Sequence, residues 1–180
     1  MKQTIPTQAV LSAGSGFSYS RPFFEDLVDS ALAHAKKIGA SDAAAEASEG
    51  SGLSVSVRKG ELENVERNRD KSLGVTVYIG KRRGNASTSD FSAAAIEQTV
   101  QAAYDIARFT AQDPFAALPD ARDIAPASRH RDDLDLFHPW AITAEQAATL
   151  ALRGESAALK TDSRISNSEG AGVSAQQSHF

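Results

Sequence analysis

Four histidines and many serine and carboxylate side chains are the residues of this 180-residue chain that could support catalysis. A zinc peptidase places two imidazoles on one helix face, as in His-Glu-x-x-His, beside a carboxylate that activates water. No two histidines here have that i, i+4 spacing; they are His34, His130, His138 and His179. We expect His34 to be a surface side chain on a helix flank. Asp132, Asp133 and Asp135, which lie between His130 and His138, leave a metal site open as an alternative.

Other catalytic motifs are missing from the sequence. No serine lies in Gly-x-Ser-x-Gly, and there is no Gly-x-x-x-x-Gly-Lys-Ser/Thr phosphate loop. The Gly-Ser-Gly at residues 50–52 lacks a following helix, and we interpret it as a turn. The residues alone therefore assign no catalytic, cofactor-binding or metal-ligating side chain to this chain.

Two surface groups leave alternatives open. Two predicted turns carry a basic cluster, whose members are Arg67, Arg69, Lys71, Lys81, Arg82 and Arg83. These side chains could contact nucleic acid if the two turns lay on one edge of the sheet. Alternatively, they are solvated charges that nearby acidic residues balance. Large apolar residues in and around a long loop could anchor the core or face a partner; they are Phe109, Phe115, Phe137 and Trp140.

Composition narrows the class of protein. A net charge of −4 argues against a general nucleic-acid binder. The absence of cysteine excludes disulfides, thiolate metal sites and a cysteine nucleophile, and it fits the cytoplasm. No apolar run approaches membrane-spanning length, so we expect no membrane association. Residues 1–20 read as a flexible N-terminal tail rather than a signal peptide.

Hydrophobic periodicity predicts the elements. A helix capped by Ser20 begins near Pro22 and stops at Gly39. Residues 42–49 form a strand, and residues 52–90 form further strands because apolar and polar side chains alternate there. Turns are predicted at residues 58–61, 68–72 and 80–84; such short connections favour antiparallel pairing. In the predicted strand at residues 61–68, apolar and polar side chains do not alternate regularly.

The second half of the chain has two further predicted elements. Asp90 or Ser92 caps a second helix, and Thr143 with Gln146 forms the capping box of a third. Residues 164–180 form a strand that lacks predicted partners. The predicted fold is α+β, a two-layer arrangement of an antiparallel sheet covered by helices. Its parts are a tail (1–20), an α+β core (21–110), an irregular connection (111–142), and a helix and strand (143–180) leading into a C-terminal domain that is mostly absent.

Four sequence segments resemble the TldD/PmbA family, on the PmbA (TldE) side. The longest is LSVSVRKGELENVERNRDKSLGVTVYIGKRRGNASTSD at residues 53–90. The others are YDIAR at 104–108, DLDLFHP at 133–139 and RISNSEG at 164–170. Together the matches extend over roughly residues 24–172. Family members are more than twice this long, so the resemblance implies that the chain holds their N-terminal domain.

The resemblance also implies a function. TldD and PmbA pair as a heterodimeric zinc-dependent peptidase that cleaves peptides or unfolded proteins, including precursors of modified peptide antibiotics during maturation. TldD-type subunits carry a His-Glu-x-x-x-His zinc motif C-terminal to this region, so zinc is expected in the TldD-type partner. PmbA-type subunits are the non-catalytic partners, and no family catalytic residue has a counterpart here. The alternative is a stand-alone peptide- or nucleic-acid-binding module.

Overall fold

A computed structural model of the chain describes residues 16–124 and 134–180, which form an α+β fold around one four-stranded antiparallel sheet. The predicted fold class is confirmed. The sheet order is β3-β2-β1-β4. In chain order the elements are α1 (Arg21–Lys37), β1 (Asp42–Arg58), β2 (Glu61–Ile79), β3 (Arg82–Thr88), α2 (Ala93–Phe109), the 3₁₀ turn η1 (Ala121–Asp123), α3 (Ala144–Lys160) and β4 (Ala171–His179).

The contacts group these elements into two compact units. Within the described residues, unit 1 comprises residues 16–49, 71–124, 134–136 and 179–180, and unit 2 comprises Gly50–Asp70 and Phe137–Ser178. Strands β1 and β2 contribute one half to each unit. Each unit therefore combines segments that are far apart in the sequence. The division of the chain into four consecutive parts remains a prediction.

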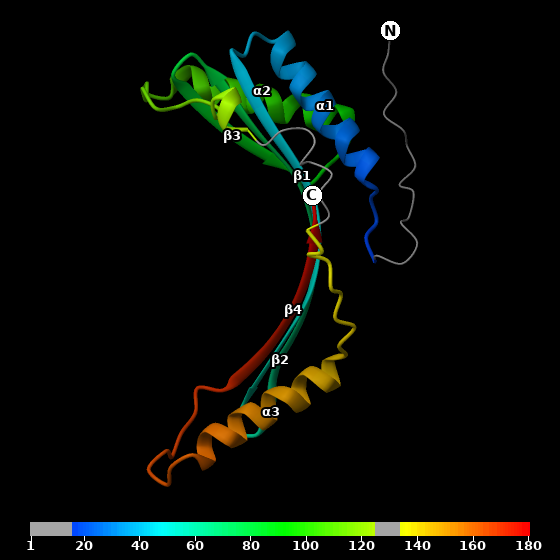
Figure 1. The fold of residues 1–180 in the computed structure, drawn as a ribbon, viewed down its shortest axis with the longest axis vertical. Helices are drawn as coiled ribbons and strands as arrows, with labels where there is room; N and C mark the ends of the chain where they lie inside the picture. Colours follow the sequence, from blue (N-terminus) through cyan, green and yellow to red (C-terminus); the bar gives the residue numbers. More distant parts are fainter. Residues whose placement is uncertain (1–15, 125–133) are drawn as a thin grey trace. The chain divides into compact units, whose positions relative to one another are not determined.

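Unit 1 packs α1 and α2 on its part of the sheet (Figure 1). The alternation of Leu73, Val75 and Val77 along β2 directs all three side chains into the core. On the helices the same core contains Leu27 and Ile96, both fully buried. Strand β3 pairs with β2 in antiparallel register from Leu73↔Thr88 to Ile79↔Arg82.

The predicted helix ends of unit 1 are confirmed. The Ser20 hydroxyl accepts a hydrogen bond from the Phe23 amide at 3.4 Å, and Ser92 accepts one from Ala95 at 3.4 Å. Of the two candidate caps for the second helix, the structure uses Ser92. Gly39 follows the C-cap of α1 with φ +95°, a conformation that favours glycine.

Two of the predicted turns are wrong. Residues 50–52 lie inside β1 and residues 68–72 lie inside β2, so each strand runs straight through the predicted break. Gly52 allows close strand packing there, because a Cβ at this position would collide with the Asn68 side chain and press on Gln176 of β4. The predicted turn at residues 58–61 is confirmed at Lys59 and Gly60, which have φ +54° and +79°.

Unit 2 packs α3 on its part of the sheet (Figure 1). The core consists of Leu53 and Val55 of β1 with Ala147 of α3, and Val173 of β4 packs against it. The predicted capping box is confirmed, because the Thr143 amide donates to Gln146 at 2.9 Å and the Gln146 amide donates to Thr143 at 3.2 Å. The last strand is shorter than predicted, starting at Ala171.

No helix within residues 16–124 and 134–180 is both long enough and apolar enough to cross a lipid bilayer.

Candidate functional site

The predicted chemistry-bearing residues do not assemble into a metal site within the described residues. His34 of α1 is partly buried, and its Nδ1 lies 4.0 Å from a carboxylate oxygen of Glu97 on α2, so it is less exposed than predicted. His130 and the first two acidic residues of the 132–135 stretch lie outside the described residues. In residues 16–124 and 134–180, no cluster of three or more His, Asp or Glu side chains could hold a metal ion.

The members of the basic cluster are divided between the two units, and not all of them lie in turns. Arg67 and Arg69 lie in the unit 2 half of β2, in a continuous strand rather than a turn. Lys71 lies in unit 1, where its ammonium group donates to the Tyr19 hydroxyl at 2.8 Å and lies 4.7 Å from the centre of the Phe91 ring. Lys71 therefore stabilises an aromatic cluster by hydrogen bonding and a cation–π contact.

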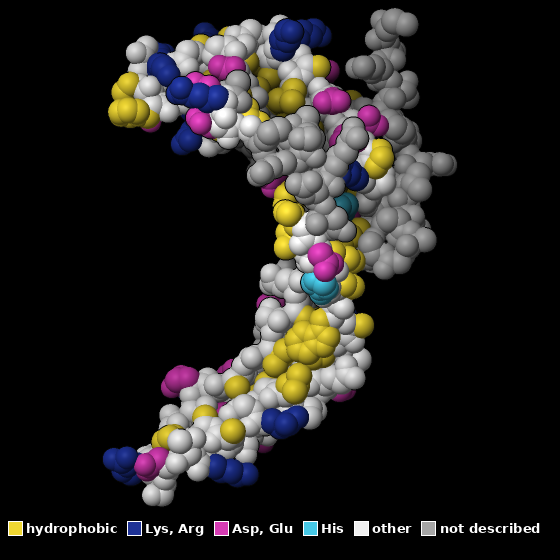
Figure 2. All heavy atoms as spheres, in the orientation of Figure 1, with side chains coloured by type: hydrophobic (Ala, Val, Ile, Leu, Met, Phe, Trp, Pro, Cys, Tyr) yellow, Lys and Arg dark blue, Asp and Glu magenta, His cyan; other side chains and the backbone are white. Residues whose placement is uncertain are grey.

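Large apolar side chains reach the surface in both units (Figure 2). Phe109, the last residue of α2, is 85% exposed, Phe115, which follows α2, is 89% exposed, and Trp140 is 57% exposed. The prediction that these three side chains anchor the core is therefore wrong. Phe137 is the least exposed of the four loop aromatics.

Glu49 is a buried carboxylate at the end of the unit 1 half of β1. Its side chain is only 3% exposed. Its two oxygens accept hydrogen bonds from the backbone amide of Ser18 at 3.0 and 2.8 Å, and one oxygen accepts from the Tyr19 amide at 3.1 Å. The chain just before α1 is thereby tied to β1.

His179, the last residue of β4, lies beside this carboxylate. Its Nε2 is 3.6 Å from Glu49, and its ring packs 4.2 Å from Phe17 and 4.8 Å from Phe24, centre to centre. Burial raises the pKa of Glu49, but the hydrogen bonds from Ser18 and Tyr19 and the nearby His179 outweigh it and hold the pKa below its ordinary value. An ionised carboxylate held by two amides serves to anchor the chain rather than to transfer protons.

Glu155 forms the corresponding anchor in unit 2. It is 2% exposed on α3, and its two oxygens accept from the amides of Lys59 and Gly60 at 2.8 Å each. These amides belong to the β1–β2 turn, whose positive φ angles direct both N–H groups to the same side. The hydrogen bond from Gly60, with that from Lys59, lowers the pKa of Glu155 despite burial.

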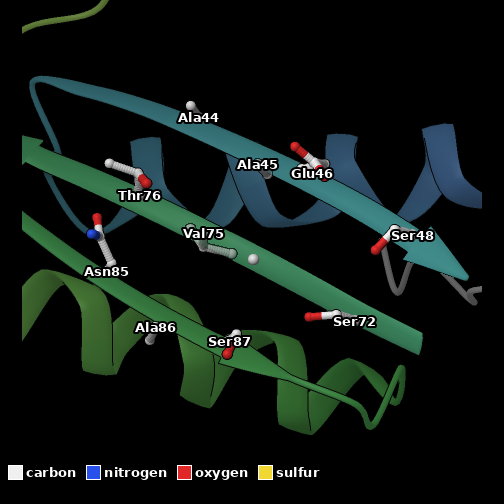
Figure 3. Close-up of a pocket in the computed structure, with 11 residues that line it drawn as sticks. Ala44, Ala45, Glu46, Ser48, Ser72, Val75, Thr76, Asn85, Ala86 and Ser87 are labelled. Carbon is white, nitrogen blue, oxygen red and sulfur yellow. The ribbon is translucent and has the colours of Figure 1, made fainter. Parts of the chain in front are cut away.

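The face of the unit 1 sheet away from the helices is hollowed (Figure 3). The hollow of about 580 Å³ is lined by short side chains from β1, β2 and β3: Ala44, Ala45, Glu46, Ser48, Ser72, Gly74, Val75, Thr76, Asn85, Ala86 and Ser87. Glu46 is the only charged residue of this lining. Hydroxyl, amide and carboxylate groups can hydrogen-bond a polar ligand, and Glu46 is the only side chain of this lining that could act as a base.

Sequence reasoning missed both buried carboxylates, although a signal for each was present. Glu49 continues the alternation of Ala43, Ala45 and Ala47, so it occupies an inward position of a strand. Glu155 follows Ala147 and Ala151 at four-residue spacing, so it occupies the apolar stripe of a helix. An acidic residue at an inward position indicates a buried hydrogen-bonding partner.

Comparison with known proteins identifies this architecture. Residues 43–107 match the model of PmbA/TldA metallopeptidase domain 1. The chain is similar to Metalloprotease PmbA of Escherichia coli O157:H7, with 49% identity over 151 residues, which are 83% of this chain and 32% of that protein. It spans about a third or less of the length of the curated relatives it matches.

Solved structures share the fold. A crystal structure of a Bacteroides thetaiotaomicron protein superposes with a TM-score of 0.64 at 20% identity, covering 88% of this chain and 34% of that one. TldE from Thermococcus kodakarensis superposes with a TM-score of 0.56 at 12% identity, covering 84% of this chain and 33% of that one. Taken with the family match, the chain carries a PmbA/TldE-like N-terminal domain and belongs to the PmbA/TldD metallopeptidase family.

Proposed function

We propose that this chain is the N-terminal domain of a non-catalytic, PmbA/TldE-like subunit of a heterodimeric metallopeptidase acting on peptides or unfolded proteins. The observation that carries the proposal is the match of residues 43–107 to the first domain of the family, supported by 49% identity to a PmbA protein. Its partner is a TldD-type subunit, which supplies the zinc. The domain contributes binding surface, and the partner carries out hydrolysis.

Two structural features support a role in binding rather than hydrolysis. The buried carboxylates of Glu49 and Glu155 are occupied by backbone amides, so neither is available to activate water. Phe109 at the end of α2, with Phe115 and Trp140 in irregular segments, presents apolar surface, as partner-facing side chains do.

Co-purification with a TldD-type subunit tests the proposal. We expect a tagged form of this chain, or a chimera that continues it with the C-terminal part of Escherichia coli PmbA, to retain the partner. Hydrolysis of an unfolded peptide should require the partner and stop when the partner's His-Glu-x-x-x-His motif is altered. Failure of both forms to retain the partner contradicts the heterodimer. Hydrolysis by either form alone contradicts the non-catalytic role.

Two accompanying proposals can be tested in the same way. A role in maturing modified peptide precursors predicts that the assembled pair processes such a precursor, measured by mass spectrometry. The cytoplasmic location suggested by the cysteine-free sequence predicts recovery in the cytosolic fraction of cells.

A further inference from the structure

We draw no further inference here: the strongest candidate, the hollow on the face of the unit 1 sheet away from the helices, is an unpartnered sheet face, and nothing in the structure shows what covers it.

Discussion

At the scale of single residues, Glu49 and Glu155 stabilise the structure in the same way. Each is a carboxylate inside its unit that accepts hydrogen bonds from two consecutive backbone amides. Bonds of this charge-assisted kind are stronger than those between neutral groups, and they supply partners to amides that no strand or helix satisfies. The acidic side chains thus hold chain segments in place.

Replacing Glu49 by glutamine should lower the free energy of unfolding at pH 7 by about 1–3 kcal/mol. The amide side chain keeps the shape but loses the charge, and its NH₂ group cannot accept from Ser18 or Tyr19. Urea unfolding followed by circular dichroism measures the change. Glu46→Gln, on the same strand at the solvent-facing hollow, is the control and should unfold like the unchanged chain.

The Glu49 anchor should also depend on pH. Its pKa is lower in the folded chain than the ordinary value of 4.5, so the ionised carboxylate contributes its full stability above that value. This contribution is lost as the pH falls through the folded-state pKa. The difference in unfolding free energy between the unchanged chain and Glu49→Gln should therefore shrink on acidification below pH 4.5. A difference that stays constant to pH 3 would contradict this account.

Gly84 allows close packing of β3 against α2. A Cβ atom there would collide with the Ala103 carbonyl oxygen and the Ala107 amide nitrogen, both backbone atoms of α2. Gly84→Ala should therefore destabilise the chain by about 1–3 kcal/mol, measured by thermal or urea unfolding. Gly74→Ala on neighbouring β2 is the matched control, since a Cβ there meets no atom within 4 Å. Equal stability of the two variants would show that α2 does not pack as closely as described.

At the scale of elements, α3 is joined to the β1–β2 hairpin by Glu155. The hairpin turn has φ values of +54° at Lys59 and +79° at Gly60. The carboxylate of Glu155 accepts a hydrogen bond from the backbone amide of each of these two residues. The helix is therefore fixed at its start by the Thr143 capping box and near its end by this contact. Local sequence predicts the first attachment, whereas the second depends on residues about 95 positions apart.

Glu155→Gln should increase local opening of the β1–β2 hairpin turn more than that of α3. We expect faster hydrogen exchange at the amides of Lys59 and Gly60 and a lower melting temperature, because one of the two acceptors becomes a donor. Hydrogen exchange followed by NMR measures both amides directly. Arg153→Gln on the exposed side of α3 is the control. Unchanged exchange at Lys59 and Gly60 in Glu155→Gln would refute the contact.

At the scale of the whole molecule, the chain represents one part of a larger family architecture, and it covers 32% of Escherichia coli PmbA. No cluster suited to a metal occurs among the described residues. Since no two histidines have the i, i+4 spacing of a zinc-peptidase helix, we expect calorimetric titration of the whole chain with zinc at micromolar concentration to show no binding. A saturable site would instead favour the alternative that uses His130, His138 and the adjacent aspartates, and replacing both histidines by alanine should then abolish it.

Local patterns predicted the helices well and the strands in part. Ser20, Ser92 and the Thr143–Gln146 box were found because a cap acts on amides within three residues of itself. The breaks at residues 50–52 and 68–72 were wrong because glycine and polar residues favour turns only when no neighbouring strand requires an extended chain. Here β1 pairs on both sides, with β2 and β4, and this pairing overrides the local preference.

The sequence by itself determined the α+β class, the helix caps and the family, since these depend on short-range periodicity and on continuous motifs. Only the tertiary structure decided that Glu49 and Glu155 are anchors and that the halves of β1 and β2 belong to different units. The physical reason is that burial, strand pairing and carboxylate–amide contacts join residues far apart in the chain, which no local pattern encodes.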